Sequence, residues 1–206
     1  MSGVMFSCFS PEQRARLARA RVGIAGAGGL GSNAAMMLAR SGIGGLVLID
    51  GDTVAASNLN RQHFMPRHTG WPKVEALAEQ LRELRPDMDV ITHQAWLDKA
   101  NISTFLSEAE LWLEAVDDAA VKAMIVTAAL RAGKPVIGAS GMGGFGGKAM
   151  ERRIMQTGRT VAAVVGDFCS DVAQLPPLAP RVMQCAAMQA DAALEWLLTE
   201  KLQPLL

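Results

Sequence analysis

Apolar residues gather into short continuous runs that alternate with longer segments of helical spacing. Such short apolar runs are typical of strands buried on both faces. The pattern predicts strands at 22–25, 46–50, 89–96, 111–116, 135–139, 148–154 and 160–165. We expect the last two to be antiparallel strands.

Between these runs the apolar residues recur every three or four positions. In the segment 72–85, for example, Val74, Leu77 and Leu81 would share one helix face, and Pro72 suits the first helical position. The same reasoning predicts helices at 31–41, 72–85, 102–106, 119–132 and 181–201. Alternating strands and helices predict an α/β, Rossmann-like fold, a mostly parallel sheet with helices on both faces and antiparallel strands towards the C-terminus.

No repeat or linker divides the chain, so we expect a single domain over 1–206, with 1–20 as a short N-terminal helix or arm. Lys and Arg total 20, as do Asp and Glu, which argues against a polybasic nucleic-acid-binding protein. No apolar run approaches the ~18 residues of a membrane span. The N-terminal apolar piece precedes the arginines, the reverse of a signal peptide, so we expect a cytoplasmic protein.

A glycine-rich turn follows the first predicted strand. Gly26, Gly28 and Gly31 form GxGxxG, with Gly29 inside it, directly before the first predicted helix. Glycine lets backbone N–H groups approach an anion at a helix N-terminus. Asp50 ends the second strand, where a carboxylate can accept hydrogen bonds from ribose hydroxyls. This combination predicts a bound nucleotide, either a nicotinamide dinucleotide or ATP.

The polar segment after Asp50 favours a triphosphate. It contains Asp52, Asn58 and Arg61, and arginine and asparagine side chains can hold phosphate oxygens through charge-assisted bonds. Lys73 would lie in the first turn of the next helix, where a cation opposes the helix dipole. An anion sharing that site, such as phosphate, would remove the conflict.

Two carboxylates, Asp117 and Asp118, follow the fourth predicted strand. Carboxylates at that edge of the sheet can hold Mg²⁺ on ATP oxygens. An aspartate at that point can equally cap the following helix. We expect one to cap and the other, Asp117, to bind magnesium.

These motifs together resemble the ThiF/MoeB/HesA family, relatives of the ubiquitin-activating enzymes. The matching pieces span roughly residues 21–125 and read RVGIAGAGGLGS, LVLIDGDTVAASNLNRQ, GWPKVEAL and LEAVDDAAVK. The later pieces PVIGASGMGG and APRVMQCAAMQAD look like the compact ThiF-type adenylyltransferases of sulfur carrier proteins.

The resemblance implies an ATP- and Mg²⁺-dependent adenylyltransferase. Its partner would be a ubiquitin-like sulfur carrier of the ThiS type, whose C-terminal Gly-Gly carboxylate is adenylylated in thiamine biosynthesis with release of pyrophosphate. The family implies a homodimer. By position, the nucleotide would be lined by Gly26, Gly28, Gly29, Gly31, Asp50 and Asp52. The phosphates would be contacted by Asn58, Arg61 and Lys73. Arg61, Lys73 and Asp117 would form the catalytic set, with Asp117 on magnesium.

The chain departs from this family in several places. It has no CxxC pair, so no zinc is carried over, and Asp118 replaces an Asn found in many relatives. Arg14 and Arg16 are the candidates for the arginine that in relatives reaches the partner subunit's ATP, but we expect a solvated helix face for both. Cys169 is the one candidate for a covalent role in the late crossover loop, and Cys185 suits a core. The glycine-dense segment 141–147 could admit a Gly-Gly tail or form a plain hairpin turn.

Several other functions stay open from the sequence. Within the family they are adenylylation of the molybdopterin carrier and ATP-dependent dehydration of a modified tRNA base. Outside it, the glycine turn and Asp50 alone would allow a nicotinamide-dependent oxidoreductase, although no hydride-transfer acid is evident. A silent binding module for a ubiquitin-like protein is a further alternative. No serine or cysteine nucleophile is paired with His63, His68 or His93.

Overall fold

The computed structural model describes residues 6–157, 160–171 and 174–203. Seven strands form one sheet in the order β3-β2-β1-β4-β5-β7-β6. Their bounds are β1 Arg21–Ala25, β2 Gly45–Ile49, β3 Asp89–His93, β4 Leu111–Glu114, β5 Val136–Ala139, β6 Glu151–Thr157 and β7 Thr160–Gly166. All neighbouring strands are parallel except β6, which pairs antiparallel with β7. The expected fold class is thereby confirmed.

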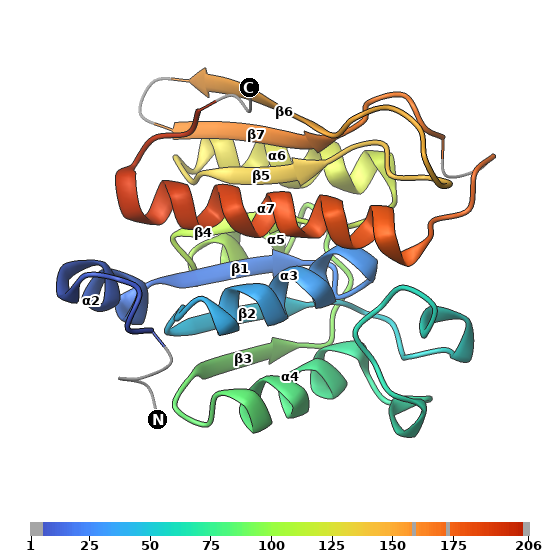
Figure 1. Ribbon diagram of the computed structural model, residues 1–206, viewed down its shortest axis with the longest axis horizontal. Coiled ribbons are helices and arrows are strands. Elements are labelled where there is room, and N and C mark those ends of the chain that lie inside the picture. The colour runs from blue at the N-terminus through green and yellow to red at the C-terminus, as the bar shows by residue number, and fades with distance from the viewer. Residues whose placement is uncertain (1–5, 158–159, 172–173, 204–206) are drawn as a thin grey trace.

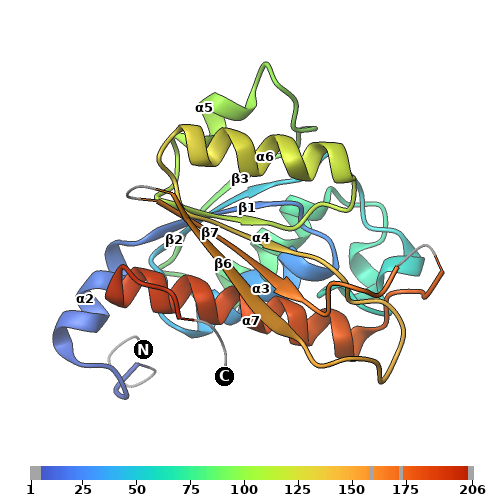
Figure 2. The same ribbon diagram turned by 90° about the horizontal axis from the view of Figure 1, so that it is seen from above.

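Helices cover both faces of the sheet (Figure 2). One face carries α3 (Gly29–Arg40), α4 (Lys73–Leu84) and α7 (Ala179–Thr199), and the other carries α5 (Ile102–Leu106) and α6 (Ala119–Arg131). The parallel strands all run towards the same side of the molecule, where the long loops gather (Figure 1). The helix α2 (Pro11–Arg19) lies at the opposite side, near the strand N-termini. In the described part of the chain, no helix is long and apolar enough to cross a membrane.

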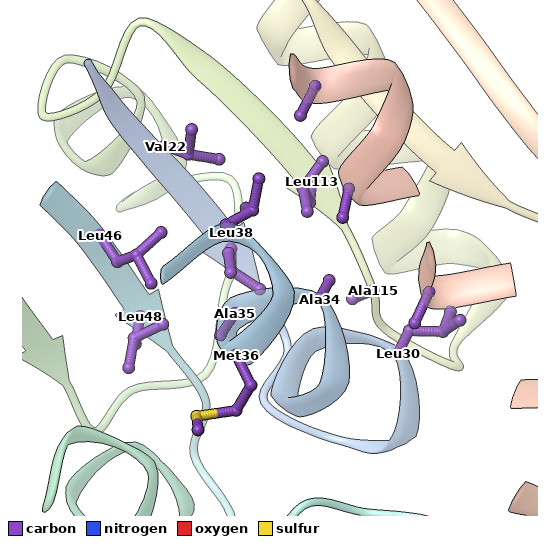
Figure 3. Packing of buried hydrophobic residues seen from close by; sticks show 14 of the residues in the cluster. Val22, Leu30, Ala34, Ala35, Met36, Leu38, Leu46, Leu48, Leu113 and Ala115 are labelled. Carbon is purple, nitrogen blue, oxygen red and sulfur yellow. The ribbon is translucent and has the colours of Figure 1, made fainter. Parts of the chain in front are cut away.

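Small residues allow the helices to lie close to the sheet. Ala34, Ala35 and Leu38 of α3 are fully buried over β1 and β2 (Figure 3). On the other face, the buried indole of Trp112 lies against Gly23, where an added Cβ would fall 2.5 Å from three ring atoms. Such close packing fixes the spacing between strands and helices, because interiors tolerate little change in volume.

Several element ends differ from the expectations. The strand predicted at 89–96 ends at His93, because its partner β2 ends at Ile49, opposite His93. Residues after His93 therefore leave the sheet at its carboxyl edge. The helix expected from Gly31 begins at Gly29. The hairpin interpretation of 141–147 is wrong, since this segment connects β5 to β6 and these strands are not neighbours.

Candidate functional site

A cavity of about 560 Å³ opens at the carboxyl edge of the sheet. This volume lies within the usual range for small-molecule sites. The loops after β1, β2, β3, β4 and β5 contribute to its wall, as does the N-terminal turn of α7. Eight predicted site residues line it: Gly26, Gly28, Gly29, Asp50, Asp52, Arg61, Lys73 and Asp117. Gly31 and Asn58 do not line it.

The glycine turn after β1 leaves little room for side chains. Gly26 has φ +99°, and a Cβ there would fall 2.6 Å from the Ala115 carbonyl oxygen. A Cβ on Gly31 would fall 1.8 Å from the Gly26 carbonyl oxygen. Gly31 is therefore required for the turn itself. The exposed wall is formed by Gly28 and Gly29 at the start of α3, a position suited to anions.

Asp50 is held by the backbone on both sides. Its carboxylate accepts hydrogen bonds from the Ala27 N–H (2.7 Å) and the Asp52 N–H (2.8 Å). A carboxylate has about four acceptor sites, so capacity for further donors is left. The backbone bond to Ala27 joins the loop after β2 to the glycine turn after β1.

Lys73 has its counter-ions within the chain. Its ammonium lies 2.6 Å from Asp52 Oδ2 and 3.9 Å from Asp50 Oδ1, and the side chain is buried. The two carboxylates therefore supply the anion that we expected a phosphate to supply near the start of α4. Although Lys73 is paired with these carboxylates, its side chain still lines the cavity and places a buried cation at the wall.

Arg61 differs from Lys73 because its guanidinium has no carboxylate partner among the described residues. It donates to the Ser57 carbonyl (3.2 Å) and to Asn60 Oδ1 (2.8 Å), both close in sequence. Its carbonyl accepts from the Asn33 amide of α3, which fixes the segment against the glycine turn. Asn58 lies away from the cavity, and its side chain accepts from the Ala55 N–H to close a 3-10 turn, 56–58.

Asp117 and Asp118 have different surroundings. Asp118 caps α6, accepting from the N–H groups of Ala120 and Val121 at 2.8 Å each. Asp117 is exposed, lines the cavity, and makes no hydrogen bond or ion pair among the described residues. The expected capping role for one of the two is confirmed. The other carboxylate remains available to a ligand.

These residues fit magnesium brought in with a nucleotide. No cluster of three or more His, Cys, Asp or Glu side chains that could hold a metal occurs in the described ranges. Magnesium is commonly bound by one or two carboxylates together with substrate phosphates and water. Asp117 could supply such a carboxylate.

A buried ion pair lies behind the Asp117 loop. Glu114, at the end of β4, is fully buried and accepts from Lys122 Nζ (2.6 Å) and the Val116 N–H (3.0 Å). Burial raises the pKa of Glu114, and the neighbouring Lys122 opposes that rise. Lys122 lines the cavity and also donates to the Ala139 carbonyl (3.0 Å). This pair ties the loop after β4 to the end of β5.

A second ion pair supports the far rim. Buried Asp167, just after β7, accepts from the backbone of Cys169 and Ser170 and from Arg181 in the first turn of α7. Burial opposes ionisation, but these donors hold the pKa of Asp167 down at about 2. Arg181 also donates to the Gly146 carbonyl, so the pair joins the glycine-dense segment to the crossover loop.

The three thiols have different environments. Cys8 and Cys169 are exposed, whereas Cys185 is buried within α7 and donates to the Val165 carbonyl. Burial raises the pKa of Cys185 to about 12. Cys185 thus belongs to the core, as expected. Cys169 does not line the cavity, but Ser170 beside it does.

Two of the three histidines pair with glutamates. His68 is fully buried, its Nδ1 accepts from the Met65 N–H (3.0 Å), and its Nε2 donates to Glu79 (2.7 Å). His93 lies 2.8 Å from Glu108. Burial lowers the pKa of His63, and the charge of Arg40 lowers it further. None of the three lines the cavity.

The structure adds three residues to those predicted. Gln62 lines the cavity, is buried, and has no hydrogen-bond partner for Oε1 in the described part of the chain. Trp96 and Lys122 also line the cavity. Gln62 ends the motif SNLNRQ and could have been chosen from the sequence. The sequence pattern did not indicate Trp96 as a site residue, because it predicted a strand that includes residue 96.

The arginines near the N-terminus lie far from the cavity within this chain. Arg14 donates to the Phe9 carbonyl (2.7 Å), and Arg16 forms an ion pair with Glu110 (2.7 Å), directly before β4. Both belong to α2, which lies at the amino edge of the sheet (Figure 1).

Comparison with known proteins gives a consistent result. The model described as "ThiF family" matches residues 2–205. "Adenylyltransferase and sulfurtransferase uba4" of Emericella nidulans is 41% identical over 135 residues, 65% of this chain and 28% of the relative. "Molybdopterin-synthase adenylyltransferase" of Escherichia coli is 35% identical over 130 residues, 63% of this chain and 52% of the relative. The matches thus cover about a quarter to half of these curated relatives.

Solved structures share the fold over nearly the whole chain. Escherichia coli tRNA N6-threonylcarbamoyladenosine dehydratase in complex with AMP superposes with a TM-score of 0.87 at 21% identity, covering 96% of this chain and 94% of that one. The same protein in complex with ATP gives a TM-score of 0.85. At this identity the similarity supports the fold alone.

Proposed function

The chain belongs to the ThiF family, and we propose that it is an adenylyltransferase which activates the C-terminal Gly-Gly carboxylate of a ubiquitin-like sulfur carrier with ATP. We further propose that the carrier is of the ThiS type and serves thiamine biosynthesis. The curated relatives named as adenylyltransferases support the reaction class. The choice of carrier rests on the resemblance of the C-terminal third to compact ThiF-type proteins.

One observation carries the proposal. Asp50 and Arg61 come from the long connection after β2, Lys73 from the start of α4 and Asp117 from the loop after β4, and all four reach one cavity beside the glycine turn. This set combines a ribose acceptor, two cations for phosphates and a free carboxylate. A nicotinamide dinucleotide would need no such set of charges.

The residues would act by positioning and by neutralising charge. A carboxylate oxygen of the carrier attacks the α-phosphorus of ATP, the bond to the β-phosphate oxygen breaks, and pyrophosphate leaves. The reaction needs no nucleophile from the enzyme, so its rate depends on alignment and electrostatic stabilisation. Asp50 and the glycine turn would hold the nucleoside, and Arg61 and Lys73 would hold the phosphates. Magnesium on Asp117 would supply further positive charge at the phosphate oxygens.

A second function shares this fold. The solved tRNA threonylcarbamoyladenosine dehydratase superposes over 94% of its own chain, so the fold is compatible with that reaction as well as with carrier activation. The chain carries equal numbers of acidic and basic residues, whereas tRNA binding needs a basic surface. We therefore rank dehydration of a tRNA base second.

The test is ATP–pyrophosphate exchange with purified protein, magnesium and a panel of Gly-Gly-ending carriers. Exchange with a ThiS-type carrier alone would support the full proposal. Exchange with a molybdopterin-type carrier alone would support the reaction but assign the protein to molybdopterin synthesis instead of thiamine biosynthesis. ATP binding without exchange on any carrier would contradict carrier activation. A parallel assay with a threonylcarbamoyladenosine-containing tRNA tests the dehydratase alternative.

Arg61→Ala is the matched variant for this assay. Among the described residues the guanidinium donates hydrogen bonds to Ser57 and Asn60 and pairs with no carboxylate, so its loss should change the thermal midpoint little and lower exchange by roughly a hundredfold or more. Arg67→Ala is the control, because Arg67 is exposed on the same segment and does not line the cavity. Its exchange rate should stay near wild type.

We also propose a homodimer, as the family resemblance implies. Light scattering on the eluting protein would measure the mass directly. A dimer in which Arg14→Ala or Arg16→Ala lowers exchange would place an arginine of one subunit at the other's site. A monomer with full activity would contradict this.

A further inference from the structure

Trp96 is the most exposed of the four tryptophans, with 69% of its surface accessible. It belongs to the loop that leaves the sheet after β3, and it lines the cavity beside Asp50 and Gly51. An aromatic side chain of this size normally buries most of its surface. Trp71 is also exposed, at 44%, but it does not line the cavity. The exposure of Trp96 is thus tied to the site.

The indole lies flat over Gly51. A Cβ on Gly51 would fall 2.5 Å from both Cδ2 and Cε2, the atoms shared by the two rings, and 2.7 Å from Nε1. One ring face is therefore covered by the backbone directly after Asp50. Since most of the residue's surface is exposed, the other face is free to receive a flat ligand group.

The loop that carries Trp96 is fixed by its own hydrogen bonds. The Trp96 carbonyl accepts from the Asn101 amide (2.8 Å), and Asp98 Oδ1 accepts from the N–H groups of Ala100 and Asn101. These bonds lead directly into α5, which packs against α6. The backbone that carries the indole is therefore ordered before any ligand arrives, which reduces the entropy lost on binding.

The wall near Trp96 differs in character from the rest of the cavity. Ala95, Leu97, Val116 and Val121 line this side and pack against the apolar cluster beneath α5 and α6. The cations Arg61 and Lys73 belong to the loop after β2 and the start of α4. A nucleotide matches this division, with a flat apolar base at one end and phosphates at the other.

We propose that Trp96 is the stacking platform for the base of the bound nucleotide, and that Gly51 is required because only its hydrogen lets the indole lie flat beside Asp50. The proposal rests on the proposed function in so far as the ligand is ATP. Stacking on an aromatic side chain contributes enough binding energy for its loss to weaken affinity about tenfold or more.

The test measures ATP affinity by calorimetry for wild type and for variants at this position. Trp96→Ala should weaken ATP binding at least about tenfold, and Trp96→Phe, which keeps an aromatic face, should stay within about threefold of wild type. Gly51→Ala should reproduce most of the Trp96→Ala loss although the indole is still present. Trp71→Phe is the control and should bind as wild type does.

Tryptophan fluorescence gives a readout that does not depend on activity. In the Trp71→Phe background, ATP should quench the emission, and the quenching should disappear on adding Trp96→Ala. Inorganic triphosphate, used as a competitor of ATP, has no base. Its affinity for wild type and Trp96→Ala should agree within about twofold.

The outcomes separate this inference from the proposed function. Wild-type-like ATP affinity of Trp96→Ala would overturn the stacking role, as would an equal loss for inorganic triphosphate. A wild type that binds no ATP would overturn both proposals. Normal ATP binding that depends on Trp96, without exchange on any carrier, would overturn only carrier activation. Thermal melting of each variant checks that it is folded.

Discussion

At the scale of single residues, two adjacent aspartates illustrate how position in the fold assigns chemistry. Asp118→Ala removes the N-cap of α6 and should destabilise the protein by about 1 kcal/mol, lowering the thermal midpoint by roughly 2–4 °C. Asp117→Asn removes no bond within the described chain, so its midpoint should stay near wild type while exchange falls at least tenfold. Calorimetry and the exchange assay measure the two effects. A reversed pattern would contradict this assignment of roles.

The thiols allow a second prediction at this scale. Cys8 and Cys169 are exposed, whereas burial raises the pKa of Cys185 to about 12. Only the thiolate reacts readily with thiol reagents. At pH 8 we expect about two thiols per native chain to react with a disulfide reagent, and three after denaturation. Cys185→Ala should leave the native count unchanged. If all three thiols of the native protein react rapidly with the reagent, α7 opens readily and the prediction is wrong.

At the scale of elements, the Asp167–Arg181 pair connects β7, α7 and the glycine-dense segment. The pKa of Asp167 is about 2 in the folded protein and 3.8 as the reference value for the unfolded chain. Because folding lowers this pKa, the stabilisation is present above about pH 4 and is lost as pH falls towards 2. The shift corresponds to about 2 kcal/mol.

The variant Asp167→Asn isolates this contribution. At pH 7 it should be less stable than wild type by at least about 2 kcal/mol, since it leaves buried Arg181 without its counter-charge. The difference in the free energy of unfolding between wild type and this variant should become smaller as the pH falls from 4 to 3, as measured by urea denaturation. Asp89→Asn breaks an exposed pair with Arg21 and should change stability by less than about 1 kcal/mol. A pH-independent difference for Asp167→Asn would contradict the assigned pKa.

At the scale of the whole molecule, the cavity joins loops from most of the sheet, so a ligand there should stabilise the entire fold. ATP at a hundred times its dissociation constant should add about 2.7 kcal/mol, raising the thermal midpoint by roughly 5–10 °C for a chain of this size. The comparison ligand is NAD⁺ at equal concentration. A larger shift with NAD⁺ would favour the oxidoreductase alternative over the proposed function.

Much of the fold followed from local sequence patterns. Short apolar runs and helical spacing are properties of neighbouring residues, so the number, kind and chain order of the strands and longer helices were predictable. The motif residues were predictable for a related reason. In a parallel sheet the carboxyl ends of the strands meet at one edge, and Gly26, Asp50 and Asp117 each follow a strand.

The tertiary structure alone decided how these parts meet. The sequence does not specify that β7 lies between β5 and β6, and this order excludes a hairpin at 141–147. Lys73 finds its anions in Asp50 and Asp52, more than twenty residues away. Trp96 becomes an exposed cavity residue because β3 ends with its partner strand at His93. Such features depend on contacts between distant segments, which local periodicity does not encode.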